Sequence, residues 1–424
     1  MNLKITISFL SLFAALQISF AQTIIDAGKI PVEGISRERV EKLDAMLEDA
    51  ITKEQVPGLV AMVVKNGKVV YHSAKGFSDV ESGKAMEKNS IFRIASQTKA
   101  ITSTAIMILW EEGKFRLDDP ISKFIPEFKN PQVLSGFRYA DTTYSTKPST
   151  REITIRHLLT HTSGLGYGVI DGDERMKMIY HKGGITDLFT TEAITIKESV
   201  TRLAKLPLHH EPGSKYTYSE GLDVLGYLVE VISGMPFDQF LKTRLFDPLG
   251  MNDTRFYLND AQAPRLVTVH TRKDGKWAAY PVTFYDPAYP KTGAKTFFSG
   301  GAGLSSTTED YAKFLQMYLN GGIYNGKRIL SPQTIQTMMQ NQVGDLWNAD
   351  RYHGIGFGVV TDKGVAMGGM GSKGTFDWGG YFNTQYFADP QTGIIGLIFK
   401  QTSGAGNGDE TGWKFRQMVF TLVE

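Results

Sequence analysis

The chain has no cysteine among its 424 residues. This absence excludes disulfides, a thiol nucleophile, thiolate metal sites and a lipid-modified N-terminal cysteine. An excess of charge of one sign is also lacking, because 46 Lys and Arg oppose 44 Asp and Glu, with no basic tract and no acidic tail. Such a balance argues against a nucleic-acid partner.

Long hydrophobic runs are scarce too, and the longest lies at the N-terminus in "MNLKITISFLSLFAALQISFAQ". One lysine, an apolar run and the small-x-small Ser19-Phe20-Ala21 are typical of a secretory signal peptide. We expect residues 1–21 to be removed and residues 22–424 to be exported to the periplasm without a membrane span. A retained membrane anchor is the alternative, but the run is shorter than the ~20 residues a span needs.

The two ends of the chain have α+β patterns, whereas the middle has mostly helical ones. A helical period covers residues 35–55, and two strand-like runs then flank Asn66-Gly67, a strong hairpin signal. Strands and helices alternate again near the C-terminus. We therefore predict an α+β fold in which terminal helices cover one antiparallel sheet. The α/β lobe would comprise about 22–90 and 290–424, and an inserted helical lobe about 91–289, with a cleft between them.

A serine and a lysine begin the buried-looking run "IFRIASQTKAITSTAIMILWEEGKF" at Ile91–Phe115. Ser96 and Lys99 are three apart, so both side chains lie on one face of a first helical turn. Free N–H groups at a helix start can hold an oxyanion, and burial beside them lowers the pKa of an amine. The pair thus has the chemistry of an activated nucleophile, although a helix cap followed by a surface lysine has the same spacing.

Several segments together resemble the serine β-lactamase and penicillin-binding protein superfamily. "FRIASQTK" is similar to its Ser-x-x-Lys box, "ITIRHLLTHTSGL" (153–165) to a signature loop, and residues 212–254 and 300–322 to later stretches. The resemblance covers nearly all of the mature chain and is closest to the class C β-lactamase-like branch, which includes family VIII carboxylesterases. It implies a serine β-lactamase/DD-peptidase-like fold and a covalent acyl-enzyme on Ser96.

The second box of this branch is Tyr-x-Asn, and here it is Tyr218-Ser219-Glu220. The resemblance makes Tyr218 the proton shuttle, which needs a cation such as Lys99 nearby because a phenol has a pKa near ~10. Glu220 departs from the pattern. We expect it to lie beside Lys99, to raise the pKa of that lysine and to give an alkaline activity optimum.

Two segments compete for the third box. A literal Lys291-Thr292-Gly293 precedes residues 300–322, which is the wrong side for this family, whereas Trp378-Gly379-Gly380 stands one strand before Asp389-Pro390, where the box is expected. Family order favours the second candidate, and Lys291 is then a loop lysine near the rim of the cleft. The resemblance implies an oxyanion hole made by the backbone N–H groups of Ser96 and Tyr381.

Histidines could instead suggest a metal site, because His157 and His161 are four apart and His209 and His210 are adjacent. No glutamate follows His157 in the metalloprotease pattern, and His161 falls in the signature loop. Gly-x-Ser-x-Gly, a phosphate-binding loop and a dinucleotide fingerprint are also missing. We therefore expect no metal and no cofactor.

Trp378 and Glu220, the two positions at which the chain departs from the family pattern, indicate the substrate class. Relatives that bind β-lactams or D-Ala-D-Ala peptides meet the substrate carboxylate with a third-box cation, and Trp378 supplies none. A charged Glu220 in the cleft would repel a carboxylate by roughly 3 kcal/mol at ~6 Å and an effective dielectric of ~20. We predict an exported serine hydrolase whose small-molecule substrates are neutral esters. A β-lactamase or D-peptidase is the first alternative, and a catalytically weak sensor with a quiet Lys99 is the second. The oligomeric state is left open.

Overall fold

The computed structural model describes residues 22–26, 32–403 and 408–423. The predicted signal peptide, residues 1–21, lies outside these described residues. Across the described ranges, no helix combines the length and apolar character needed to cross a membrane.

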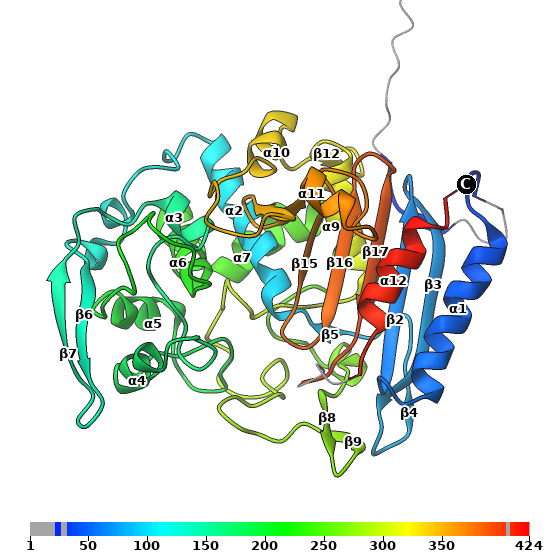
Figure 1. Cartoon of the computed structure of the whole chain (residues 1–424), viewed down its shortest axis with the longest axis horizontal. Helices are drawn as coiled ribbons and strands as arrows, with labels where there is room; N and C mark the ends of the chain where they lie inside the picture. Colours follow the sequence, from blue (N-terminus) through cyan, green and yellow to red (C-terminus); the bar gives the residue numbers. More distant parts are fainter. Residues whose placement is uncertain (1–21, 27–31, 404–407, 424) are drawn as a thin grey trace, which may run out of the picture.

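A nine-stranded sheet organises the molecule (Figure 1). Its strands follow the order β1-β3-β2-β17-β16-β15-β14-β13, with β4 paired to β3, and all neighbours are antiparallel except β1 and β3. The predicted α+β class and antiparallel sheet are therefore confirmed, apart from the short parallel edge. The strands are β1 (Ile25–Asp26), β2 (Gly58–Lys65), β3 (Lys68–Asp79), β4 (Lys84–Ala85), β13 (Arg351–His353), β14 (Gly358–Val360), β15 (Phe376–Gly379), β16 (Thr384–Asp389) and β17 (Ile394–Phe399).

The predicted hairpin joins β2 and β3 through Asn66-Gly67. Both residues have positive φ, 48° and 73°, as a tight two-residue hairpin turn requires. Seven consecutive residues of β2, Gly58–Val64, are buried because helices cover both faces of the sheet. The run therefore reads as continuously apolar instead of alternating.

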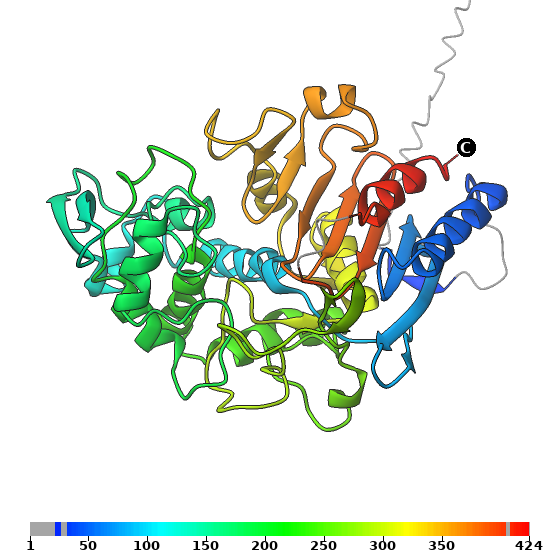
Figure 2. The ribbon, with the colours of Figure 1, turned by 60° about the horizontal axis from the view of Figure 1, so that its bottom comes forward.

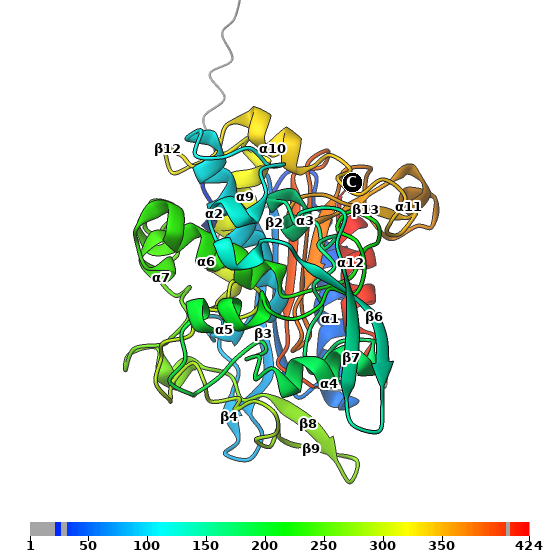
Figure 3. The same cartoon turned by 90° about the vertical axis from the view of Figure 1, so that its left-hand side faces the viewer.

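Helices α1 (Arg37–Thr52) and α12 (Thr411–Phe420) pack together on one face of the sheet, and α9 (Thr308–Leu319) packs on the other. Figure 3 shows this layering, with the first and last helices of the chain side by side. Leu43 and Leu47 of α1 share a buried cluster with Phe415 and Val419 of α12. The two ends of the chain are thus held against each other by apolar contacts.

The middle of the chain forms the mainly helical part, seen in green on the left of Figure 2. Contrary to expectation, it also contains two hairpins, β6–β7 and β8–β9. The remaining helices are α2 (Thr98–Glu111), α3 (Ile155–Leu159), α4 (Glu174–Lys182), α5 (Ile196–Leu203), α6 (Gly221–Ser233), α7 (Phe237–Leu241), α8 (Asp247–Leu249), α10 (Pro332–Met338) and α11 (Asp362–Ala366). The remaining strands are β5 (Phe92–Arg93), β6 (Gln132–Arg138), β7 (Thr143–Pro148), β8 (His270–Lys273), β9 (Lys276–Ala279), β10 (Ser305–Ser306), β11 (Ile323–Tyr324) and β12 (Lys327–Arg328).

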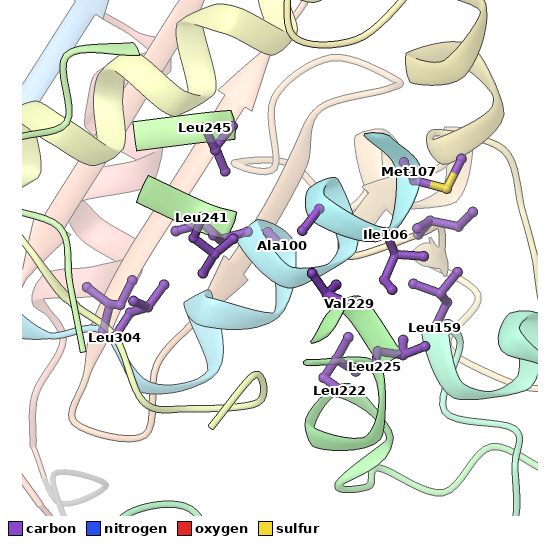
Figure 4. Packing of buried hydrophobic residues seen from close by; sticks show 14 of the residues in the cluster. Ala100, Ile106, Met107, Leu159, Leu222, Leu225, Val229, Leu241, Leu245 and Leu304 are labelled. Atoms are coloured by element: carbon purple, nitrogen blue, oxygen red, sulfur yellow. The ribbon is translucent and has the colours of Figure 1, made fainter. Parts of the chain in front are cut away.

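Helix α2 runs through the core, and every residue from Thr98 to Leu109 is buried. Figure 4 shows Ile106 of α2 on the side of the helix that faces Leu159 of α3 and Leu225 of α6. A helix that is apolar on all sides needs such a surrounding. The first turn of α2 is consequently a rigid base for the groups at its start.

Candidate active site

Ser96 lies at a sharp turn between β5 and α2. The preceding Ala95 has a φ of 44°, in the left-handed region that residues other than glycine seldom occupy. Residues Ala95–Gln97 form a single 3-10 turn that leads directly into α2. Strained backbone of this kind is typical of functional sites, and here it sets the serine at the head of the buried helix.

The structure brings together the three side chains to which the sequence assigns catalysis. The Tyr218 hydroxyl donates a hydrogen bond to Ser96 Oγ over 2.7 Å, and Lys99 Nζ lies 3.4 Å from the same oxygen. Nζ also lies 4.6 Å from the centre of the Tyr218 ring. A cation at this position stabilises negative charge on the phenol oxygen, which is what a proton shuttle needs.

Lys99 has two further partners. It donates hydrogen bonds to the Tyr167 hydroxyl at 2.9 Å and to the Gly301 carbonyl at 2.8 Å, and only 3% of the lysine is exposed. With Ser96 Oγ these make three acceptors, which match the three N–H donors of an ammonium group. The amine is therefore fixed in place behind the serine.

Tyr167 is a site residue that the sequence analysis missed. It follows the signature loop directly, and a phenol at that place has no recognisable spacing to Ser96. Burial, followed by the nearby Tyr218, raises the pKa of Tyr167 well above its usual value. Tyr167 therefore stays a neutral phenol, and it serves as an acceptor for Lys99.

The ring nitrogens of His157 and His161, which could have indicated a metal site, accept hydrogen bonds from backbone N–H groups. His157 Nδ1 accepts from the Thr154 N–H at 3.2 Å, and His161 Nδ1 accepts from the Ser219 N–H at 3.2 Å. His161 also packs 4.6 Å from the Tyr218 ring, and burial lowers its pKa well below the usual range. The neutral imidazole thus supports the loop that carries Tyr218.

Of the other pair, His209 Nε2 lies 2.9 Å from Asp171 Oδ2, and His210 Nε2 lies 2.9 Å from the Thr217 hydroxyl. Among the described residues, no group of three or more His, Asp or Glu is arranged to hold a metal ion.

Trp378-Gly379-Gly380 lies next to the nucleophile. Trp378 and Gly379 end β15, and the Trp378 ring stacks on Tyr218 at 6.3 Å. A Cβ on Gly380 would come within 2.4 Å of the Ile94 carbonyl oxygen, so a glycine is required for this close approach. Within the described residues, neither the Ser96 nor the Tyr381 N–H has a hydrogen-bond partner, which leaves both available for an oxyanion.

The literal Lys291-Thr292-Gly293 is an exposed loop and not a strand. The backbone N–H groups of Lys291 and Thr292 donate to Ala288, and Gly293 abuts Thr191. The tripeptide is therefore not a β-edge that could align a substrate.

The surroundings of Glu220 disfavour the negative charge that the sequence suggested. It is 2% exposed, and burial raises the pKa of its carboxyl well above the usual value, with further contributions from Asp187 and Asp223. This shift runs against the expectation of a negative Glu220 that holds Lys99 protonated. The physical reason is that desolvation and two neighbouring acids both favour the neutral carboxyl.

The buried acid Asp223 is linked to Lys99 through Gly301. Its Oδ1 accepts from the Gly301 N–H at 3.1 Å, and the carbonyl of the same glycine accepts from Lys99. Burial raises the pKa of Asp223, whereas Lys99 lowers it. Asp223 was missed because it lies three residues beyond the matched Tyr-x-Asn position, inside α6.

Comparison with known proteins gives one family. A family model described as Beta-lactamase matches residues 43–417. The chain is 31% identical to the esterase EstB of Burkholderia gladioli over 389 residues, which cover 86% of this chain and 91% of that protein. It is also 31% identical to the acyltransferase mokF of Monascus pilosus over 319 residues, which cover 72% and 71% of the two chains.

A solved structure shares the fold. It is EstCE1, described as a hydrolase with promiscuous acyltransferase activity, with a TM-score of 0.77 and 28% identity. The likeness covers 90% of this chain and 99% of that one.

Proposed function

Because the chain belongs to the Beta-lactamase family and is a serine hydrolase, we propose that it cleaves neutral esters with apolar acyl groups through an acyl-enzyme on Ser96. The observation that carries the proposal is the 2.7 Å hydrogen bond between Tyr218 and Ser96 Oγ, with Lys99 fixed behind both. A nucleophile within hydrogen-bond reach of its base is the arrangement that acyl transfer requires.

The reaction then proceeds in two steps. In the reacting form the Tyr218 oxygen is deprotonated and its negative charge is stabilised by the Lys99 ammonium. Ser96 Oγ attacks the ester carbonyl carbon while its proton passes to this phenolate oxygen, and the carbonyl oxygen becomes an oxyanion held by the N–H groups of Ser96 and Tyr381. The bond to the leaving oxygen breaks, and that oxygen receives the proton from Tyr218. Water attacks the acyl-enzyme in the same way, gives its proton to Tyr218, and the proton returns to Ser96 as the acid is released.

The surroundings of the serine favour an apolar, uncharged acyl group. Trp378 supplies no cation to meet a substrate carboxylate. Two groups of aromatic rings adjoin the site residues. One group contacts Tyr218 through Trp378 and comprises Tyr216, Trp347, His353 and Trp378. The other group includes Tyr381 and comprises Phe189, Tyr285, Tyr381 and Phe382. Because burial and the neighbouring acids raise the pKa of Glu220, the proposal rests on these rings and on Trp378, and not on charge repulsion.

The decisive experiment compares substrates on the wild type and on Ser96→Ala. We expect p-nitrophenyl butyrate and hexanoate to be cleaved faster than the acetate, and nitrocefin and D-Ala-D-Ala peptides to be poor substrates. Ser96→Ala is expected to lose turnover and labelling by a fluorophosphonate. Labelling at another serine, or faster turnover of nitrocefin than of the esters, would overturn the proposal.

Acyl transfer is the second candidate activity. It needs an alcohol in place of water at the same acyl-enzyme, and mokF and EstCE1 are described with that activity. Adding a primary alcohol to the ester assay is expected to divert part of the acyl group into a new ester. Unchanged product ratios across alcohol concentrations would restrict the enzyme to hydrolysis.

We also propose that the chain is exported to the periplasm after cleavage behind Ala21. The support is the sequence pattern at residues 1–21. Expression of the full chain with a C-terminal tag, followed by fractionation and N-terminal sequencing, tests it. A cytoplasmic product that retains Met1 would contradict export.

A further inference from the structure

Three consecutive residues after β17, Lys400, Gln401 and Thr402, lie between the two segments that carry the expected oxyanion donors. All three are 1% exposed. One segment is β5, which leads to Ser96, and the other is the turn that follows β15 and carries Tyr381. Polar side chains buried this deeply need partners, and here the partners belong to those two segments.

Gln401 binds the nucleophile segment. Its Oε1 accepts from the Arg93 N–H at 2.7 Å, and its Nε2 donates to the Arg93 carbonyl at 3.2 Å. Arg93 is three residues before Ser96, and its guanidinium donates to the Val267 carbonyl at 2.7 Å and to Gln401 Oε1 at 3.3 Å. The amide of Gln401 therefore pairs with the backbone of β5 as a neighbouring strand would. This pairing fixes the position of β5 relative to the end of β17.

Thr402 binds the turn that carries Tyr381. Its N–H donates to the Phe382 carbonyl at 3.1 Å, and its hydroxyl accepts from Asn383 Nδ2 at 3.0 Å. Asn383 has a φ of 71° and its N–H donates to the Gly380 carbonyl at 2.9 Å, which closes the turn around Tyr381.

Lys400 acts on the same turn through Asp409. Its ammonium donates to Asp409 Oδ2 at 2.6 Å, and the same carboxylate oxygen accepts from Asn383 Nδ2 at 2.7 Å. Lys400 also donates to the Thr411 hydroxyl at 2.8 Å. A buried ion pair adds little net stability because both charges lose their hydration, so its contribution here is better sought in geometry.

We propose that Lys400, Gln401, Thr402 and Asp409 are positioning residues that set the distance between the two oxyanion donors, the N–H groups of Ser96 and Tyr381. The inference rests on the proposed hydrolase function. Gln401 holds the segment of the first donor, and the other three hold the turn of the second. The pair Ala95 and Phe382 shares one buried cluster, which joins the two segments on the core side as well.

A matched pair of variants at Thr402 tests the inference. Thr402→Val keeps the shape and loses the hydroxyl acceptor, whereas Thr402→Ser keeps it. An oxyanion forms only in the transition state, so a displaced donor lowers kcat and leaves KM unchanged. Loss of one donor costs about 10²–10³ in kcat, and a displaced donor is expected to cost about 10–100-fold. We expect that loss in Thr402→Val and a kcat within threefold of wild type in Thr402→Ser.

Two further variants test each half of the arrangement separately. Gln401→Met removes all three hydrogen bonds of the Gln401 side chain with Arg93, and Asn383→Gly removes the amide while keeping the positive φ. Each is expected to lower kcat and the rate of fluorophosphonate labelling in parallel, with KM within twofold. Melting temperatures are measured alongside, and a variant that does not fold is replaced by Lys400→Met/Asp409→Asn, which removes the two charges together.

The possible results separate the two proposals. If the wild type turns over no ester, the proposed function fails. If the wild type is active and these variants lose melting temperature but keep kcat, the residues are structural and the inference fails. A rise in KM at constant kcat also overturns it, because the residues would then bind the ground state.

Discussion

Two tyrosines share Lys99, and their positions assign different roles. Tyr218 reaches both Ser96 Oγ and the lysine, whereas Tyr167 accepts a hydrogen bond from the lysine. A general acid–base group contributes about 10²–10⁴ to rate. Tyr218→Phe is therefore expected to lower kcat by about that factor for a p-nitrophenyl ester. Tyr167→Phe is expected to cost about tenfold, the effect of one lost hydrogen bond. Equal losses in the two variants would mean that Tyr167 also transfers protons.

The raised pKa of Glu220 has a consequence for stability. The pKa of its carboxyl is raised in the folded protein, so the folded state holds a proton that the unfolded state releases above about pH 4.5. Stability from this group falls as pH rises from that value to the folded pKa. Glu220→Gln removes the titration, and the variant is expected to lose less stability than wild type between pH 5 and pH 9. Denaturant unfolding at several pH values measures this, and identical slopes would show that Glu220 is charged in both states.

At the scale of elements, the end of β15 is the critical edge. Gly380→Val places a Cβ against the Ile94 carbonyl oxygen and the Thr384 hydroxyl, at 2.4 and 2.3 Å, so the strand must move away from Ser96. We expect this variant to lose at least 10²-fold in acylation rate. Lys291→Ala, in the exposed loop, is expected to stay within a few-fold. The opposite result would mean that the literal Lys-Thr-Gly is the functional box.

Elements with strong local signals were predictable. Asn66-Gly67 fixed the first hairpin because few other residues adopt two consecutive positive φ values, and the apolar run after Ala95 required a buried helix. The hairpin β6–β7 was missed because every residue of β7 is exposed. Its sequence therefore lacks the alternation that identifies a strand.

The residues of the candidate site also divide into those that the sequence predicted and those that it did not. Ser96, Lys99 and Tyr218 were found because each belongs to a short motif at a fixed spacing. The pairing of Glu220 with Asp187 joins positions 33 apart in no motif, and the charge of an acid depends on burial that a sequence does not state. The substitution at position 220 was therefore visible in the sequence, but its effect was not.

For the whole molecule, buried histidines make the fold sensitive to acid. Burial lowers the pKa of His353 to about 4, so between about pH 6.5 and 4 the unfolded chain binds a proton that the folded protein does not. The free energy of unfolding therefore decreases by about 3 kcal/mol as the pH is lowered through this range, at 1.36 kcal/mol per pKa unit. His353→Gln is expected to flatten this loss, whereas His181→Gln on the exposed surface is not. Equal acid slopes in both variants would place the sensitivity elsewhere.

The order of the strands also determines when the central sheet can be completed during synthesis of the chain. Strand β2 lies between β3 and β17, so residues 58–65 must wait for residues 394–399 before the centre of the sheet exists. Until β17 emerges from the ribosome, the edges of β2 and β16 that pair with it have no partner strand. Pairings between such distant residues close slowly, and partly made chains are prone to aggregate. A chain truncated before β17 is expected to be insoluble, and activity is expected to return only in the slowest refolding phase.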